Sequence, residues 1–163
     1  MLFQSFAKNF GLYGERAGAF SIVTDSTAEK DVVMSRIKQI ARPIYSNPPI
    51  HGARIVDIIL GDEELTKSWH NDLKIMSSRI IDMRAGLVAS LKALGNEHDW
   101  SHVTDQIGMF AFTGLSKDMV NQLREEHAIY MTMDARISLA GLNSGNLEYV
   151  AAAFHKVTHG KKF

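Results

Sequence analysis

The lysine at position 8 lies in a stretch rich in aromatic residues and glycine. A lysine amine is a nucleophile only in its neutral form, which apolar surroundings or a nearby cation favour. Its neighbours Phe6 and Phe10 can supply the apolar surface, and Arg16 can supply the cation. Ser5 and Arg16 together carry the donors that hold a phosphate. The stretch therefore indicates a nucleophilic lysine, Lys8, beside a phosphate site, with an ordinary solvated lysine as the alternative.

Two arginines, Arg42 and Arg136, are candidates for binding carboxylates, because a guanidinium binds a carboxylate through two parallel hydrogen bonds. Arg42 precedes Pro43, whose ring disfavours helical geometry at the residue before it, so a helix is expected to end near Ala41. In a strand predicted at 135–140, the period of two directs Arg136 away from the apolar face. Two guanidinium groups that bind in this way suit a substrate with two carboxylates. Spacing alone does not place them in one cavity, and an ordinary surface arginine is the alternative for each.

The elements around these residues are predicted from hydrophobic periodicity, capping residues and turn residues. Short strands at 1–7 and 19–24 would flank the loop of Lys8, and Ser26 with Glu29 forms a capping box at the start of a helix. The further elements expected are a helix at 50–60, a long helix at 62–94 closed by Gly95, a strand at 107–112, a helix capped by Ser116, strands at 129–132 and 135–140, and a helix at 147–157. Strands and helices alternate in both halves, so the predicted class is α/β with helix predominating.

The helix predicted at 62–94 is the longest element. At ~1.5 Å per residue it would be about 50 Å long, longer than most small domains are wide. We therefore expect it to bridge two lobes, and 163 residues suffice for one domain or two small lobes. The segment 50–60 is apolar on most faces, which predicts a buried helix.

Composition excludes several classes of protein. The 18 basic and 18 acidic residues balance, so no net charge favours nucleic acid or an acidic membrane surface as a partner. The absence of cysteine excludes disulfides and thiolate metal sites. The apolar runs are too short to span a bilayer. The N-terminus lacks a secretory signal and is typical of the inside of a strand, as though the chain begins within a domain, and a basic tail, Lys161 and Lys162, follows the last helix.

The seven histidines form no metal signature. His98 and His102 are four residues apart, but the segment between them is interpreted as a loop, and no H-E-x-x-H motif occurs. No metal site is therefore predicted. The chain also has no P-loop and no G-x-S-x-G motif, so phosphoryl transfer and serine hydrolysis have no support.

Four segments resemble those of aspartate aminotransferases, which are pyridoxal-phosphate-dependent enzymes of fold type I. These segments are residues 5–18, 42–49, 104–110 and 136–141, in the order of the family. The resemblance extends from Gln4 nearly to the end. It implies the C-terminal part of a fold type I transferase, helix-rich, with a long interdomain helix leading to a small α/β domain. Residues 1–75 would end the large cofactor-binding domain, and residues 76–163 would form the small domain.

The resemblance implies a cofactor, pyridoxal phosphate, and the residues that hold it. In the family, the lysine that matches Lys8 forms a Schiff base, the internal aldimine, with the cofactor. The residues that match Ser5 and Arg16 bind the cofactor phosphate. Once released by substrate, Lys8 would carry the proton from the α-carbon of the amino acid to the cofactor.

Substrate-binding residues are implied in the same way. The residue that matches Arg136 grips the α-carboxylate, and the residue that matches Arg42 reaches from the neighbouring subunit of a homodimer to the side-chain carboxylate. Phe110 would form a wall of the substrate pocket, with a core phenylalanine as the alternative. Ala135 departs from the family, which often has glycine before this arginine, so the resemblance does not determine the fine geometry of the arginine strand.

The function implied is transamination in amino acid metabolism, L-aspartate with 2-oxoglutarate giving oxaloacetate and L-glutamate, in the cytoplasm or the mitochondrial matrix. In the family, the carboxylate that pairs with the pyridine nitrogen, the stacking aromatic ring and the glycine-serine phosphate loop lie upstream of the lysine, and no segment here resembles them. The chain is therefore expected to be a fragment that is inactive alone. Two alternatives stay open, an aromatic amino acid aminotransferase of the same fold and a noncatalytic fragment that binds a partner subunit.

Overall fold

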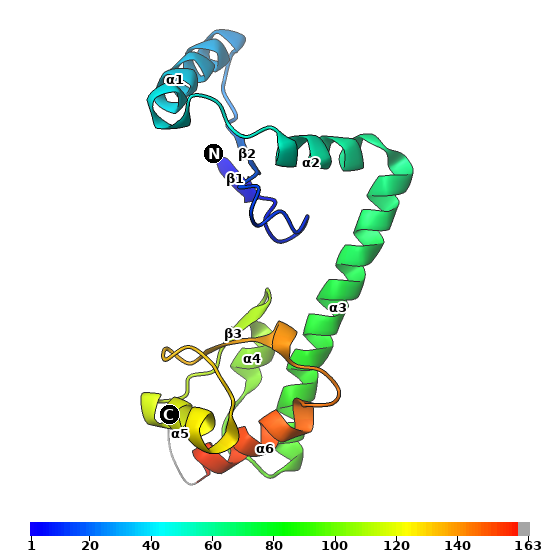
Figure 1. The fold of residues 1–163 in the computed structure, drawn as a ribbon, viewed down its shortest axis with the longest axis vertical. Coiled ribbons are helices and arrows are strands. Elements are labelled where there is room, and N and C mark those ends of the chain that lie inside the picture. Colours follow the sequence, from blue (N-terminus) through cyan, green and yellow to red (C-terminus); the bar gives the residue numbers. More distant parts are fainter. Residues whose placement is uncertain (160–163) are drawn as a thin grey trace. The chain divides into compact units, whose positions relative to one another are not determined.

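The computed structural model, drawn in Figure 1, describes residues 1–159. Its contacts divide it into two compact units, Met1–Leu73 and a second unit that begins at Lys74. The division falls within one long helix. The basic tail, Lys161 and Lys162, lies outside the described residues.

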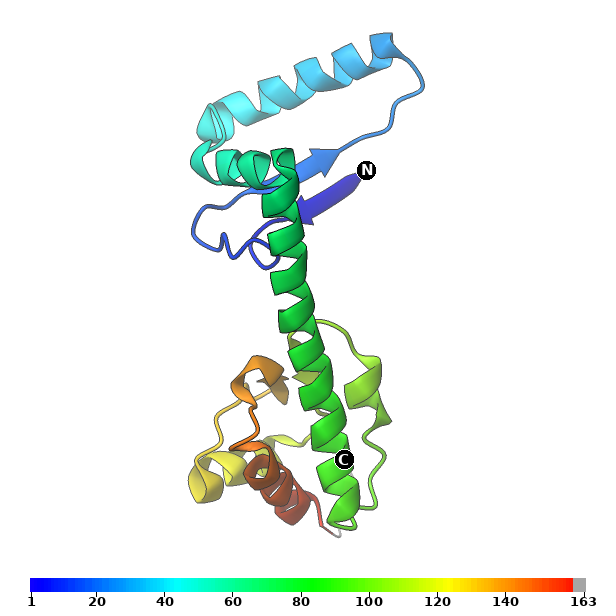
Figure 2. The ribbon, with the colours of Figure 1, turned by 90° about the vertical axis from the view of Figure 1, so that its right-hand side faces the viewer.

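The first unit opens with a hairpin, β1 (Leu2–Ser5) and β2 (Gly18–Ser21), whose arrows run antiparallel in Figure 2. Both strands were predicted, and both are shorter than predicted. Phe3 pairs with Phe20 across the hairpin, and their rings stack with centroids 4.4 Å apart. A Cβ on Gly18 would lie 2.4 Å from the backbone oxygen of Gln4, so only glycine allows the strands to pair this closely.

Helix α1 (Thr27–Tyr45) begins at the predicted capping box. Ser26 Oγ accepts a hydrogen bond from Glu29 N at 3.1 Å, and Glu29 Oε2 accepts one from Asp25 N at 2.8 Å. The first bond satisfies a backbone donor that the first turn of a helix leaves free, and the second fixes the residue before the N-cap.

The end of α1 differs from the prediction. The helix continues through Pro43 to Tyr45 instead of ending near Ala41, so the prediction that Pro43 ends the helix is wrong. A proline this close to a C-terminus removes one backbone hydrogen bond and interrupts only the last turn. Ser46, at φ 64°, then closes the helix by donating from its backbone N to Ala41 O at 3.2 Å.

Helix α2 (His51–Gly61) was predicted at 50–60 as a buried helix, and its position is confirmed. The prediction that this helix is buried is wrong. Only Gly52 and Val56 of the helix are buried, and Ile58 is 62% exposed. The buried face packs on the loop between β1 and β2, where a Cβ on Gly52 would lie 2.7 Å from Glu15 Cβ. Being apolar on most faces does not bury a helix that is packed on one face.

Helix α3 (Glu63–Ala93) is 31 residues long, close to the predicted 62–94. Its length corresponds to about 46 Å at ~1.5 Å per residue. Asp62 Oδ1 accepts from Leu65 N at 2.9 Å at its start. At its end Gly95 adopts φ +73°, the left-handed conformation in which glycine commonly ends a helix.

The second unit has a hydrophobic core to which α3, α5, α6 and a two-stranded sheet contribute. Its elements are α4 (Ser101–Asp105), β3 (Phe110–Phe112), α5 (Lys117–His127), β4 (Arg136–Ser138), the 3₁₀ turn η1 (Leu139–Gly141) and α6 (Leu147–Thr158). Leu87, Leu91 and Phe154 are fully buried in this core. Ser116 caps α5 as predicted, accepting from Met119 N at 3.3 Å. In the described residues helix predominates over two small sheets, which confirms the predicted class.

The strands of the second unit are shorter than predicted. β3 covers only the end of the predicted 107–112, because Gly108 turns the chain at φ +85°. β4 stops at Ser138, and the predicted alternation holds, with Ile137 buried between exposed neighbours. The strand predicted at 129–132 is absent from the described residues, because the backbone N of Thr132 is used in a tight turn, donating to Arg136 O at 3.2 Å.

Asn96, just after α3, ties that end of the helix to α6. Its Oδ1 accepts from His98 N at 3.1 Å and from Trp100 Nε1 at 3.0 Å. Its Nδ2 donates to Thr158 Oγ1 at 2.9 Å and lies 3.3 Å from His155 Nδ1. One amide thus joins the segment after α3 to helix α6.

Candidate active site

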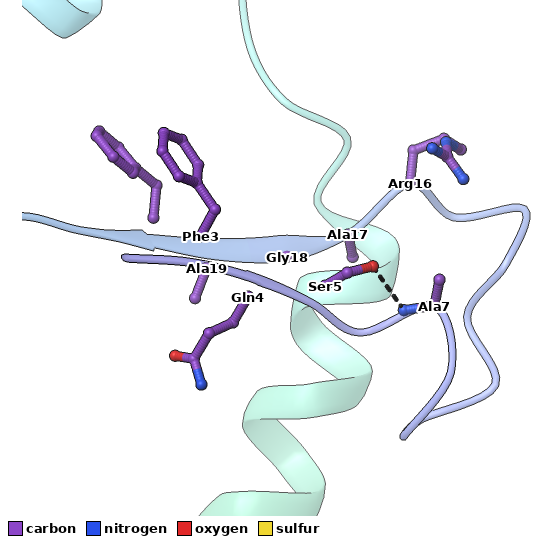
Figure 3. A pocket seen from close by; sticks show the side chains of 9 residues that line it. Phe3, Gln4, Ser5, Ala7, Arg16, Ala17, Gly18 and Ala19 are labelled. Carbon is purple, nitrogen blue, oxygen red and sulfur yellow. Dashed lines mark hydrogen bonds between the residues drawn. The ribbon is translucent and has the colours of Figure 1, made fainter. Parts of the chain in front are cut away.

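A hollow of about 330 Å³ lies against the hairpin of the first unit (Figure 3). Ser5 and Arg16, the two residues expected to bind a phosphate, both line it, together with Ala7 and Gly18. β1 ends at Ser5 and β2 begins at Gly18, and the antiparallel register pairs these two residues. The hairpin therefore brings Ser5 and Arg16, which are eleven positions apart in the sequence, to the same hollow.

The donors of Ser5 and Arg16 remain open to a ligand. Ser5 Oγ accepts from Ala7 N at 3.2 Å, drawn as the dashed line in Figure 3, which leaves its hydroxyl hydrogen able to donate. Arg16 Nη1 donates to Tyr13 O at 3.1 Å, and no carboxylate among the described residues pairs with the guanidinium. Arg16 also adopts φ 51°, a left-handed backbone that costs a non-glycine residue ~1–2 kcal/mol. Such strain is characteristic of binding sites.

Lys8 is exposed on the loop between the strands and is not among the residues that line the hollow. Its Nζ lies 4.0 Å from the centroid of the Tyr13 ring, over the electron-rich face that attracts a cation. Gly11, at φ +66°, turns the loop and donates from its backbone N to Lys8 O at 3.2 Å. Tyr13 was not predicted as a site residue, although an aromatic residue between two glycines shortly after the lysine is a signal for it.

The two phenylalanines expected beside Lys8 support the loop instead. Phe6 and Phe10 pack edge to face with ring centroids 5.3 Å apart, and Phe10 stacks on Trp69 of α3 at 4.5 Å. Trp69 Nε1 also donates to Asn9 O at 2.8 Å. The beginning of α3 thus fixes the backbone next to Lys8.

Arg42 lies in the last turn of α1, on a helix and not in the extended conformation that the sequence suggested. Its Nη1 donates to Ser46 Oγ at 2.6 Å, one helical turn further on. The side chain is exposed, and no carboxylate among the described residues pairs with it.

Arg136 and Phe110 lie together in the second unit, on the exposed face of the sheet of β3 and β4. The guanidinium carbon of Arg136 is 5.0 Å from the centroid of the Phe110 ring. Phe110 is 40% exposed, so it does not behave as a core phenylalanine. Within residues 1–159 the Arg136 guanidinium has no carboxylate partner. It is therefore available to bind an external carboxylate.

The turn before Arg136 is built around Asp134. Its carboxylate accepts from Thr132 Oγ1 and from Arg136 N, and these bonds, with the charge of Arg136, lower the pKa of Asp134. Ala135 adopts φ 65°, a left-handed conformation that glycine adopts without strain and alanine does not.

The two histidines considered as metal ligands have separate partners. His98 Nε2 lies 3.0 Å from Thr158 O, and His102 Nε2 lies 3.2 Å from Thr113 O. In the part of the chain that the structure describes, no three side chains are grouped in a way that could hold a metal. None of its helices is both long and apolar enough to cross a membrane.

Residues 1–154 match the family described as aminotransferase class I and II. The chain belongs to this family, which confirms the resemblance. It is 55% identical over 157 residues to the mitochondrial aspartate aminotransferase of Dictyostelium discoideum and 53% identical over 158 residues to that of Gallus gallus. These alignments cover 96% and 97% of this chain, and the chain spans 37% of the length of each relative.

Solved structures of the family have the same fold. A mitochondrial aspartate aminotransferase from Trypanosoma brucei superposes with a TM-score of 0.91 at 52% identity, over 95% of this chain and 41% of that one. An aromatic-amino-acid aminotransferase from Burkholderia pseudomallei, covalently bound to pyridoxal phosphate, gives 0.92 at 48% identity, over 95% of this chain and 39% of that one. The likeness confirms the fold type I class.

Proposed function

We propose that the protein to which this chain belongs is a pyridoxal-phosphate-dependent aspartate aminotransferase that converts L-aspartate and 2-oxoglutarate to oxaloacetate and L-glutamate. The supporting observation is the convergence of Ser5 and Arg16 on one hollow at the loop of Lys8, in a chain 55% identical to an aspartate aminotransferase. Three curated relatives are named mitochondrial, while a yeast structure is described as cytoplasmic, so the proposal includes both compartments.

The donor set at the hollow fits the phosphate of this cofactor. A phosphate monoester accepts hydrogen bonds through several oxygens, and an open hydroxyl with a guanidinium that lacks an anionic partner matches that need. In the proposal Ser5 and Arg16 hold the phosphate, which leaves the rest of the cofactor to be bound through Lys8.

Lys8 would provide both the attachment and the proton transfer. Its Nζ would hold the cofactor covalently, and the same atom would take the proton from the α-carbon of the amino acid. Bound pyridoxal phosphate supplies the electron sink for the pair that this proton leaves behind. The Tyr13 ring lies where it can hold the Lys8 ammonium once that amine has taken the proton.

The arginines would bind the substrate. Arg136, oriented by Phe110 and without a carboxylate partner in the described residues, would take the α-carboxylate as a fork. Arg42 would take the second carboxylate of aspartate or 2-oxoglutarate, from the neighbouring subunit of a homodimer. Residues 1–75 and 76–163 remain the proposed parts of the large and small domains.

Borohydride reduction tests the assignment of Lys8. Reduction of the pyridoxal-phosphate-loaded protein should fix a pyridoxyl group on the peptide that contains Lys8, and Lys8→Ala should lose the label. Lys30→Ala is the matched control, because Lys30 is an exposed lysine paired with Asp31 at 3.2 Å, and it should keep the label. A label on Lys30 or Lys38 would refute the assignment, and a protein that takes no label would favour the noncatalytic alternative.

An aromatic aminotransferase is the second candidate function. Solved structures of that name superpose as well as the aspartate enzymes do, with TM-scores of 0.92 and 0.91 at 48% and 41% identity. Because the Psychrobacter enzyme of that name was cocrystallised with aspartic acid, fold and carboxylate binding do not separate the two functions. Arg42 is the residue whose substitution can separate them.

A further inference from the structure

Arg84 is a buried cation on α3 that binds backbone carbonyls. The residue is 3% exposed. Its Nη1 donates to Val103 O at 2.5 Å, and its Nη2 donates to Gly108 O at 2.8 Å and to Phe110 O at 2.7 Å. Among the described residues no carboxylate pairs with it. Burial lowers the pKa of the Arg84 guanidinium, the direction expected for a cation withdrawn from water.

Core filling does not explain this residue. Desolvating a charge is costly, and an apolar side chain of similar volume is often as stabilising as a buried charge or more so. A guanidinium offers instead a rigid, planar set of donors with fixed directions. At Arg84 these donors hold together the carbonyls of α4 and of the turn that leads into β3.

A backbone bond from Leu139 N to Met109 O at 2.9 Å also holds that turn, but neighbouring side chains contribute little. Ile107 is 93% exposed, so its side chain does not anchor the turn in the core, and Gly108 is exposed at φ +85°. The side-chain amide of Gln106 bonds both backbone groups of Phe112. It donates to Phe112 O at 3.0 Å and accepts from Phe112 N at 2.8 Å. The backbone of β3 is therefore held by β4 along one edge and by two side chains, Gln106 and Arg84, elsewhere.

We propose that Arg84 is a positioning residue for carboxylate binding: it fixes the backbone of Phe110, and the Phe110 ring in turn orients the Arg136 guanidinium. The chain of contacts runs from Arg84 Nη2 to Phe110 O at 2.7 Å and from the Phe110 ring to Arg136 Cζ at 5.0 Å. The inference rests on the proposed function, in which Arg136 binds the α-carboxylate of the substrate.

Arg84→Met tests the proposal in the pyridoxal-phosphate-loaded protein, because it keeps an unbranched side chain and removes all donors. We expect the KM for aspartate to rise roughly tenfold or more, as displaced binding groups generally cause, with a smaller change in kcat. Amide hydrogen exchange should become faster across residues 106–112. Arg84→Lys keeps the charge but offers a single ammonium, so the changes in KM and in exchange should both be intermediate. If Arg84→Met does not fold, the proposal is tested with Arg84→Lys.

Asn96→Ala is the matched control, since it breaks the tie between α3 and α6 without touching β3. It should lower the melting temperature while leaving the KM and the exchange of 106–112 unchanged. A merely structural Arg84 would behave like Asn96, and an unchanged KM in Arg84→Met would overturn the proposal.

The two hypotheses fail differently. If the complete unsubstituted protein, of which this chain is a part, does not transaminate, the proposed function is wrong. In that case faster exchange of 106–112 in Arg84→Met, but not in Asn96→Ala, would still support the positioning of this segment by Arg84, and equal exchange would overturn it.

Discussion

The guanidinium carbon of Arg136 lies 5.0 Å from the centroid of the Phe110 ring, although the strand register pairs Arg136 with Phe112. The contact is therefore diagonal across the sheet, a separation that long side chains bridge. A ring that attracts the cation restricts its orientation while leaving its in-plane donors available. The sheet thus presents a partly oriented, exposed guanidinium.

The ring contact predicts a modest loss when Phe110 is replaced. Phe110→Leu removes a partly exposed cation–π interaction, which should raise the KM for aspartate about two- to fivefold. Phe112→Leu is the control, because Phe112 is 55% exposed on the same face of the strand and makes no such contact with a cation within residues 1–159. Equal effects in the two variants would show that the ring does not orient Arg136.

Substrate choice is predicted to depend on Arg42. Arg42→Ala should weaken aspartate and 2-oxoglutarate while sparing phenylalanine, whereas Arg136→Ala should weaken all three. Losing a buried charge partner typically costs ~2–5 kcal/mol, which is at least tenfold in kcat/KM. Arg36→Ala on the same helix, where Arg36 bonds Gln39 at 3.0 Å, should leave both substrates unaffected. Equal losses for aspartate and phenylalanine in Arg42→Ala would favour the aromatic aminotransferase.

The hairpin predicts a requirement for glycine at position 18. A Cβ there would meet Gln4 O at 2.4 Å, so Gly18→Ala should push the strands apart and lower the free energy of unfolding by ~1–3 kcal/mol, as overpacking does. Because Ser5 is its register partner, affinity for pyridoxal phosphate should fall as well. Chemical denaturation and cofactor titration measure the two effects. Gly14→Ala, which would meet nothing within 4 Å, is the control, and a loss as large as that of Gly18→Ala would contradict the argument.

Asp134 predicts a dependence of stability on pH. The hydroxyl of Thr132 is the largest cause of its lowered pKa, followed among the favourable contributions by the backbone N and the charge of Arg136. A lowered folded-state pKa stabilises the protein above the unfolded value of about 3.9, and this contribution disappears as the pH falls through the folded-state value. The difference in melting temperature between the protein and Asp134→Asn should therefore be largest near neutral pH and shrink below about pH 4.

Thr132→Val provides the internal check on this pH effect. Without the hydroxyl, the pKa of Asp134 should return toward its ordinary value, so a second substitution, Asp134→Asn, should change the pH profile less. A profile that is the same with and without Thr132 would assign the effect to another group.

Local sequence rules predicted the elements whose determinants are close in sequence. The bonds from Ser26 to Glu29 and from Ser116 to Met119 span three residues, and both caps are where the sequence placed them. The prediction failed at Pro43. The rule that a helix ends before a proline does not hold there, because the last turn of a helix tolerates one missing backbone hydrogen bond. The strand predicted at 129–132 failed because β-type residues need a neighbouring strand, which a local pattern does not supply.

In the candidate site, too, some features follow from local sequence and others depend on the fold. The convergence of Ser5 and Arg16 follows from the pairing of the two strands that the sequence predicts around the loop, so the residues of the proposed phosphate site could be anticipated. The Tyr13 ring under Lys8 depends on how a glycine-rich loop turns, and the grip of Arg84 depends on carbonyls whose positions only the fold determines. Roles assigned to Lys8, Arg42 and Arg136 remain proposals.

The carbonyl partners of Arg84 also bear on the order in which the second unit folds. They lie 19, 24 and 26 residues along the chain from it. Until α3, α4 and β3 have met, the guanidinium prefers water, and a half-assembled state would strip that water without supplying all three oxygens. Intermediates with the helix docked but the loop still open should therefore be poorly populated. The same contacts that orient a binding group would make the acquisition of this unit's structure an all-or-none event.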